Sequence, residues 1–466
     1  MSARRLRWLA AAALLAAAVG WSVQRRAAPA RPDIVLIVWD TCRADRLSAY
    51  GYGKETSPWL ESFAEDAVLF REAYSPSPWT PPAHGSLFTG LLPKRHGLLQ
   101  GLGDRIAPGI PLLAETLRKA GYETVCFTAN GFISSVTGLD AGFEKVVPLY
   151  RGDSVARADL VVEEIDAWLT ARANAPGCPA RPLFLFVNFM DLHIPRTPSL
   201  EDALAMAGRP DPGHGIGRAL LLDPTDAVAH VLGVERLDAE TLAGMGPVYD
   251  ASARFLDGCT GRLADRLRRA GILDGAFFAL AGDHGEHLGE QGRISHEMSL
   301  YDPVLRIPMV VRWPGRLDGG RVETAQVRLQ DLYPTILEAA GIPVPNRTGT
   351  DAKTLTESPL RPRLLNAAFH RPTAYLAGAR KSFSGAHPVV FEKFLVSIHG
   401  VQDPADAPRA RKFLLYAKKD GEAPAVTQRE ELFDRIADPG DLRDLLREIS
   451  PEEQEDVERL RGMLVR

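Results

Sequence analysis

The chain has few cysteines and little net charge for its length. Its 466 residues include four cysteines, and the formal net charge is −4. Cys42, Cys126, Cys178 and Cys259 show neither CxxC nor zinc-finger spacing, so we expect buried free thiols, with one disulfide as the alternative. Because no basic field extends beyond the amino terminus, the composition does not favour nucleic acid as a partner.

The amino-terminal apolar run is short. It extends from Trp8 to about Val23, less than the roughly 20 residues that span a bilayer comfortably, and three arginines within residues 1–7 precede it, as in a secretory signal. Arg25 and Arg26 follow, where a cleavage site would prefer small neutral residues. We expect residues 1–30 to be a signal peptide or an uncleaved membrane anchor. Either would export the rest, to the periplasm or to the outward face of the inner membrane.

The remaining sequence is typical of a globular α/β protein. With 45% apolar and 24% charged residues it can bury one large core and a smaller one. Apolar runs and helical patterns alternate, which predicts a doubly wound, mostly parallel sheet. The expected parallel strands are Asp33–Trp39, Glu123–Thr128, Leu183–Phe189, Ala276–Leu280 and Pro308–Arg312. The expected helices are Thr56–Ala67, Pro111–Ala120, Asp159–Ala173, Val248–Ala270 and Gln330–Ala340.

Composition predicts three regions after the amino terminus. Residues 31–345 are expected to form the main domain, with a Gly- and Pro-rich insertion at 196–247 as a lid. Residues 346–466 are expected to form a small α+β subdomain. Its expected elements are strands at Pro388–Ile398 and Lys412–Ala417 and a closing helix at Pro451–Arg466.

Three aspartates stand near the carboxyl ends of predicted strands: Asp40, Asp191 and Asp283. Ligands of open α/β sheets bind at this edge. Asp283 is followed by His284, and an adjacent carboxylate and imidazole suit one divalent cation. His193 follows Asp191 closely.

The segment from Thr80 to Gly90, Thr-Pro-Pro-Ala-His-Gly-Ser-Leu-Phe-Thr-Gly, resembles the signature of the sulfatase family of the alkaline phosphatase superfamily. Thr80 stands where sulfatases carry the Cys or Ser that becomes formylglycine, and His84 stands where they carry Arg. The resemblance extends from about Asp33 to Asp438. Further similar blocks are Asp40–Leu47, Phe184–Pro195, Asp283–Glu286, Ser295–Asp302 and Glu431–Asp434.

The resemblance implies one divalent metal ion held by Asp40, Thr80, Asp283 and His284. Many sulfatases have two adjacent Asp ligands where this chain has Asp40 and Thr41. A site with fewer oxygens and one nitrogen favours Zn²⁺ or Mn²⁺ over Ca²⁺. The family's Lys and His residues that grip sulfate are not evident.

Threonine cannot be converted to formylglycine, and related phosphodiesterases and phosphotransferases use an unmodified Thr. The resemblance therefore implies that Thr80 attacks phosphorus. We expect Thr80 to cap a helix running to Leu92. His193 is expected to neutralise the ester oxygens, and His296 or His84 to protonate the leaving oxygen.

The sequence predicts an exported, metal-dependent hydrolase or transferase for phosphate esters of a small molecule, glycan or lipid. The alternatives are a sulfuric ester hydrolase, a two-metal phosphodiesterase using Asp191, His193 and His296, and a non-catalytic binding protein. His96 and His287 are expected to be solvated loop residues.

Overall fold

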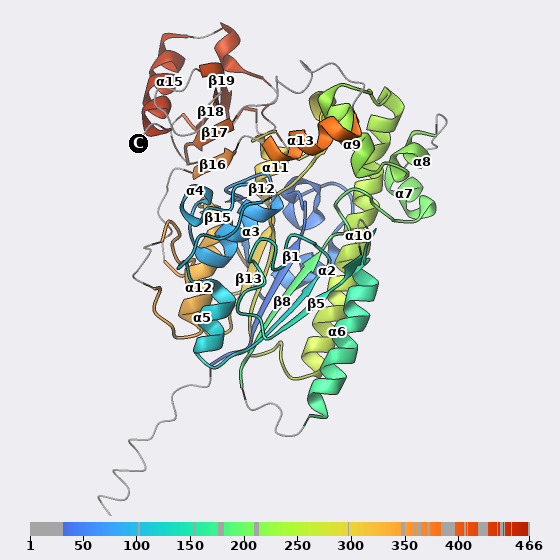
Figure 1. The fold of residues 1–466 in the computed structure, drawn as a ribbon, viewed down its shortest axis with the longest axis vertical. Coiled ribbons are helices and arrows are strands. Elements are labelled where there is room, and N and C mark those ends of the chain that lie inside the picture. The colour runs from blue at the N-terminus through green and yellow to red at the C-terminus, as the bar shows by residue number, and fades with distance from the viewer. Residues whose placement is uncertain are drawn as a thin grey trace, which may run out of the picture.

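An eight-stranded sheet forms the body of the protein in this computed structural model (Figure 1). The strand order is β14-β2-β13-β9-β1-β8-β4-β5. Their bounds in that order are Arg321–Glu323, Val68–Phe70, Met309–Arg312, Phe277–Gly282, Ile34–Trp39, Leu183–Phe189, Glu123–Thr128 and Lys145–Pro148.

The structure describes residues 31–464 except 101–102, 152–153, 176–180, 209–213, 297, 346–349, 358–359, 361–364, 371–372, 384–396, 405–406, 408, 418–426, 436, 439–440, 442 and 449. The expected signal or anchor, Cys178 and most of the expected strand Pro388–Ile398 lie outside the described residues. Within them, no helix is both long and apolar enough to cross a bilayer.

The five strands β9, β1, β8, β4 and β5 run parallel, which confirms the predicted fold class. Every residue of β1 is fully buried, so its sequence is a continuous apolar run rather than an alternation. The prediction was wrong for Pro308–Arg312, because β13 runs antiparallel to both of its neighbours. An apolar run reflects burial on two faces and carries no information on strand direction.

Helices cover both faces of the sheet, as Figure 1 shows. Ile34, Leu36 and Val38 of β1 pack in one core, and the alternate residues pack in the other. The first face carries α3 (Thr80–Thr89), α5 (Leu113–Lys119) and α12 (Leu332–Ala339), and the second carries α2 (Pro58–Ala64), α6 (Ala158–Ala173) and α10 (Ala239–Arg269). Cys42, Cys126 and Cys259 are buried free thiols, as expected.

The long helix α10 begins at Ala239, earlier than the predicted Val248. The Asp238 side chain accepts a hydrogen bond from the Thr241 N–H at 2.8 Å and so caps the helix. Gly244, Gly246 and Pro247 lie in its first turns and obscure the helical pattern in the sequence. The preceding insertion contains α7 (Leu200–Ala207), α8 (Gly215–Leu220) and α9 (Pro224–Leu232). Its role as a lid stays a prediction.

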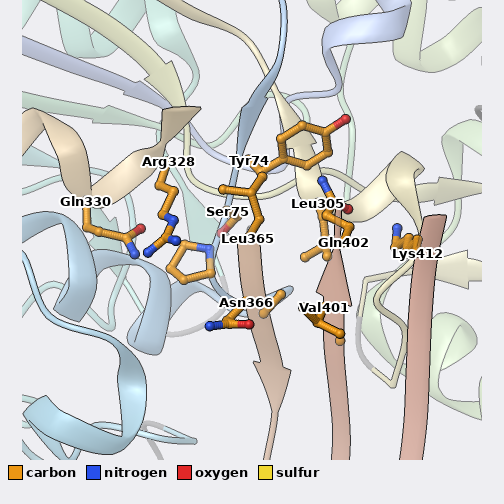
Figure 2. A pocket seen from close by; sticks show the side chains of 13 residues that line it. Tyr74, Ser75, Leu305, Arg328, Gln330, Leu365, Asn366, Val401, Gln402 and Lys412 are labelled. Carbon is orange, nitrogen blue, oxygen red and sulfur yellow. The ribbon is translucent and has the colours of Figure 1, made fainter. Parts of the chain in front are cut away.

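A four-stranded antiparallel sheet follows, with α15 (Pro451–Leu464) packed on it. Lys412 of this sheet is buried and donates to Asp302 at 2.6 Å and to Asp441 at 2.5 Å, which links the sheet to the main body. Figure 2 shows the same contact region, where Arg328 and Gln330 face a cavity of about 10 Å³. The strands are β16 (Leu365–Phe369), β17 (Ser397–Gln402), β18 (Arg411–Ala417) and β19 (Thr427–Asp434).

Short elements complete the fold. They are α4 (Pro93–His96), α11 (Asp302–Leu305), α13 (Thr373–Ser382), β3 (Ala73–Tyr74), β6 (Tyr150–Arg151), β7 (Ser154–Val155), β10 (His287–Leu288), β11 (Ile294–Ser295), β12 (Arg306–Ile307) and β15 (Val327–Arg328). The hairpin β10-β11 matters most for the site, because it directly follows Asp283 and His284.

Candidate active site and metal centre

The carboxyl edge of the parallel sheet gathers a buried acidic cluster. Asp40 follows β1 and Asp283 follows β9, and these two strands are neighbours. Both carboxylates and His284 are fully buried. One potential ligand atom from each of the three lies within 4.8 Å of the others. We call Asp40, Asp283 and His284 the buried triad.

One oxygen of each triad carboxylate is fixed by the protein. Asp40 Oδ2 accepts from Asn130 Nδ2 at 2.8 Å and lies 3.5 Å from Asn188 Nδ2. Asp283 Oδ1 accepts from the backbone N–H groups of Thr41 at 3.1 Å and His284 at 2.8 Å. These contacts fix how the two carboxylates are oriented.

The other two oxygens, Asp40 Oδ1 and Asp283 Oδ2, are buried without a hydrogen-bond partner among the described residues. Burial raises the pKa of both carboxyls to about 7, and the charge of Asp283 adds to the effect on Asp40. Two buried carboxylates side by side, each with one oxygen that lacks a hydrogen bond, are unfavourable unless a cation offsets their charge. The donor set therefore fits one divalent metal ion.

Thr80 is the first residue of α3, and its hydroxyl Oγ1 lies 3.2 Å from His284 Nε2. The expectation that Thr80 caps a helix ending at Leu92 was wrong: Trp79 holds the cap position and α3 ends at Thr89. Pro81 follows at a position that needs no N–H, so the helix begins at Thr80 itself. Its hydroxyl is then available to the triad.

His84 lies one helical turn below Thr80 and is fully buried. Its Nδ1 is 3.1 Å from the Thr80 carbonyl oxygen and 3.5 Å from Asp283 Oδ2, and its ring packs edge-on against Phe88 and Phe186. Burial lowers the pKa of His84 to about 3. His84 is therefore a neutral imidazole beneath the triad.

His193 and His296 stand beside the triad. The His296 ring centroid is 4.5 Å from that of His284 and 5.2 Å from that of His193, which is half-buried. Burial lowers the pKa of His193 to about 4 and that of His296 well below its usual value. Trp79 lies 5.6 Å from the His296 ring. Each of the four predicted catalytic residues thus lies next to the triad or next to a residue that does.

Asp191 lies apart from the triad. Its Oδ1 accepts from the Ala158 N–H at 3.0 Å, at the start of α6. Across the described ranges, the triad is the one group of three His, Cys, Asp or Glu whose atoms lie close enough to hold a metal ion. This geometry gives no support to a second metal held by Asp191, His193 and His296.

Sequence reasoning missed a buried pair next to His296. Glu286 Oε1 lies 3.5 Å from His296 Nδ1, and the other oxygen of Glu286 pairs with Arg196. It also missed Asn130 and Asn188 as partners of Asp40. The signal for these was present, because both asparagines stand at or just beyond the carboxyl ends of predicted strands.

Most of the chain matches a known protein family. The family model Sulfatase matches residues 32–342. The chain belongs to the sulfatase family. Human arylsulfatase A is 26% identical over 364 residues, covering 72% of this chain and 68% of the relative. The uncharacterized sulfatase YidJ of Escherichia coli is 24% identical over 356 residues, covering 68% and 69%.

Solved structures share the fold. A phosphonate monoester hydrolase of Agrobacterium radiobacter superposes with a TM-score of 0.67 at 19% identity, covering 93% of this chain and 96% of that one. A protein in complex with its substrate D-glucosamine-2-N,6-O-disulfate gives a TM-score of 0.68 at 17% identity, covering 93% and 97%. The sulfatase family is metal-dependent, and the buried triad lies within the matched residues.

This sulfatase-family chain departs from the family pattern beside the triad. Thr41, where many sulfatases have a second Asp, donates its hydroxyl to the Asp40 carbonyl oxygen at 2.7 Å. Its backbone has a positive φ of 56°, and its N–H supports Asp283. Thr41 therefore orients a triad carboxylate through its backbone and adds no carboxylate of its own.

Proposed function

We propose that this sulfatase-family hydrolase cleaves or transfers phosphate esters with the Thr80 hydroxyl as nucleophile. The main support is the position of that hydroxyl, 3.2 Å from His284 Nε2 and beside two buried carboxylates. Because Thr80 cannot become formylglycine, its own oxygen must form any covalent intermediate.

Asp40, Asp283, His284 and the Thr80 oxygen would hold one divalent cation, with Zn²⁺ or Mn²⁺ favoured over Ca²⁺ by the nitrogen ligand and the few oxygens. When bound, such an ion supplies positive charge that lowers the pKa of a ligated hydroxyl and neutralises ester oxygens. Asn130 and the Thr41 N–H hold the two carboxylates in place for this role.

In the proposed reaction, Thr80 Oγ1 releases its proton to water and forms a bond to phosphorus, the ester P–O bond breaks, and the leaving oxygen takes a proton. The dipole of α3 favours the anionic phosphoryl group at its amino terminus. Pro81 and Pro82 have no N–H, and the Ala83 N–H already donates to Trp79 O at 3.1 Å. Helix α3 thus stabilises the phosphoryl group mainly through its dipole, because these N–H groups are missing or already bonded.

His296 and His193 are the proposed sources of that proton and of hydrogen bonds to the ester oxygens. Both are neutral near pH 7 because burial lowers their pKa values. A bound anionic ester would favour the protonated form of the ring that contacts it. For His84 we propose a positioning role, since its ring lies beneath Thr80 and Asp283.

Water or a second alcohol would then attack the phospho-Thr80, restoring the hydroxyl and releasing phosphate or a new ester. A sulfate ester could transfer its group to Thr80 in the same way. The resulting sulfo-Thr80 would lack the escape route of a hydrated aldehyde, and turnover would stall.

A sulfuric ester hydrolase is the second candidate, because the curated relatives carry sulfatase names. A non-catalytic binding protein is the third. The unpartnered oxygens of Asp40 and Asp283 count against it, because a pure binding fold gains nothing from burying two adjacent carboxylates.

The proposal also covers the segments outside the triad and the class of substrate. We propose that residues 1–30 direct export, that 196–247 limit access to the triad and that 346–466 form a subdomain. A small-molecule, glycan or lipid ester is the proposed substrate. A glycan is consistent with the neighbour that holds a glucosamine disulfate.

The test is steady-state hydrolysis of paired aryl phosphate, aryl phosphodiester and aryl sulfate by the metal-loaded protein. Thr80→Ala should abolish phosphate release, whereas Thr89→Ala, at a buried threonine in the same helix, should not. Thr80-dependent turnover of the sulfate alone would establish the second candidate. Binding of one metal ion with no turnover of any ester would favour the third.

A further inference from the structure

A second concave site lies on the hairpin that follows the triad. It is a pocket of about 420 Å³ between the β10-β11 hairpin and the segment that joins α9 to α10. Leu237 and Leu242 contribute from the insertion, and Ile294 and Met298 contribute from the hairpin side. We call it the hairpin pocket.

The polar lining of the hairpin pocket is basic. Arg236, Arg293, His230 and His287 line it, and no acidic side chain is among its lining residues in the described part of the chain. Arg236 is exposed, and the Arg293 guanidinium lies 5.0 Å from the Tyr301 ring centroid. Such a surface concentrates anions.

The nearest hairpin carboxylate does not neutralise this lining. Glu290 pairs with Arg43 at 2.7 Å through one oxygen and accepts from the Leu288 N–H at 2.7 Å through the other. His230 is also satisfied, between Gly292 O at 2.8 Å and the Leu237 N–H at 3.0 Å. The two arginines and His287 are therefore the groups that remain to meet a ligand.

The state of His287 supports a ligand site independently of the charge of the lining. This residue was expected to be solvated, yet it is 2% exposed. Its Nε2 lies 2.8 Å from Ser299 Oγ, and its Nδ1 has no hydrogen-bond partner among the described residues. A buried ring nitrogen without a hydrogen-bond partner is costly, and His287 is one of the residues that line the basic pocket.

The hairpin also relates this pocket to the triad. His287 pairs with Ser295 across the hairpin, so the residues next to them, Glu286 and His296, lie near each other beside the triad. Neighbouring residues of the hairpin segment, Glu286 and His287, thus belong one to the surroundings of the triad and the other to the pocket.

We propose that the hairpin pocket binds an anionic group (phosphate, sulfate or carboxylate) through Arg236, Arg293 and His287. The anion is either a second charged group of the substrate, remote from the scissile ester, or a separate ion. The first source rests on the proposed ester-cleaving function, whereas binding of an anion does not.

The binding test uses inorganic sulfate and isothermal titration with the metal-loaded Thr80→Ala protein. Arg236→Gln/Arg293→Gln should weaken sulfate binding at least tenfold, while Arg268→Gln, at an exposed arginine near the far end of α10, should leave it unchanged. Crystals soaked in tungstate should show an anomalous peak beside His287 that the double variant lacks. Two results would overturn the proposal. One is an equal affinity for sulfate in the Arg236→Gln/Arg293→Gln variant and in the Arg268→Gln control. The other is a tungstate peak in the crystal without measurable sulfate binding in solution (an adventitious ion only).

Kinetics of the wild-type protein separate the two sources. If the substrate supplies the anion, the double variant raises KM at least tenfold for an ester with a second anionic group, with kcat unchanged, and leaves an aryl monoester unaffected. If a separate ion binds, added sulfate changes turnover of the monoester in the wild type and not in the double variant. The titration measures sulfate binding even if the protein hydrolyses no ester. Failure of the proposed function and failure of the proposed anion site therefore give different results.

Discussion

The Thr80 hydroxyl oxygen and His284 Nε2 lie 3.2 Å apart although 204 positions separate them in the chain. Thr80 begins a helix on one face of the sheet, and His284 follows a strand at the sheet's carboxyl edge. The fold therefore brings a potential nucleophile and a potential metal ligand from distant parts of the chain into contact.

The nucleophile proposal predicts different outcomes for two substitutions at Thr80. Thr80→Ala removes the attacking oxygen, and kcat for a phosphate ester should fall by about 10³-fold or more. Thr80→Ser keeps an oxygen on Cβ and should retain most of that activity. Rapid-mix kinetics with an aryl phosphate measure both. An active Thr80→Ala protein would show that another group attacks.

The metal proposal predicts that a chelator destabilises the protein because it removes the ion held by the triad. An ion present at one hundred times its Kd contributes about 2.7 kcal/mol to the free energy of unfolding, so chelation should lower Tm clearly. Asp40→Asn removes a ligand and should abolish both this shift and the bound metal. Asp191→Asn is the matched control and should keep one metal ion per chain, because Asp191 caps α6. If Asp191→Asn lost bound metal, the alternative of a second metal ion held by Asp191, His193 and His296 would be supported.

The buried His96 predicts a pH dependence of stability. Its ring packs under Gly85, its Nε2 is 3.1 Å from Ser86 Oγ, and burial lowers its pKa from 6.5 to about 3. Because the unfolded chain binds the proton first, the stabilisation is complete above pH 6.5 and is lost as pH falls toward 3. The slope is at most about 1.4 kcal/mol per pH unit.

Urea unfolding between pH 7 and 4.5 checks this. His96→Gln should reduce the slope of the free energy of unfolding against pH, whatever its effect at pH 7, while the other buried histidines keep the rest of the slope. His214→Gln, at an exposed histidine, should leave the wild-type slope. A His96→Gln protein with the unchanged slope would contradict the assignment.

The Arg196–Glu286 pair predicts non-additive stability effects. Both side chains are at most 4% exposed, and removing either partner leaves the other charge buried at a cost of about 3–5 kcal/mol. The double variant Arg196→Met/Glu286→Met should cost less than the sum of the single variants. Thermal unfolding of the four proteins gives the coupling energy, and an additive result would mean that the pair is not formed.

Local patterns in the sequence predicted most of the sheet, and the family resemblance predicted the residues of the triad. The strands Glu123–Thr128 and Leu183–Phe189 were predicted with the bounds they have, and the Asp283-His284 dipeptide after a strand indicated a metal site. The direction of β13 could not be predicted, since an apolar run is the same in either direction.

The partners of the site residues were harder to predict, because tertiary packing decides them. His96 and His287 were expected in solvent, yet the helix turn of Gly85 covers His96, and Ser299 and Tyr301 lie against His287. Glu286 and Arg196 look like ordinary surface residues in the sequence. Only the fold shows that they pair beside His296.

Intact-protein mass spectrometry tests the central claim most directly. The metal-loaded protein without residues 1–30 is mixed briefly with an aryl phosphate, a phosphodiester or an aryl sulfate and then quenched, alongside Thr80→Ala. The account predicts a transient phosphoryl adduct on Thr80 that is absent from Thr80→Ala and decays on turnover. Phosphate release without such an adduct, or an adduct that persists in Thr80→Ala, would contradict it.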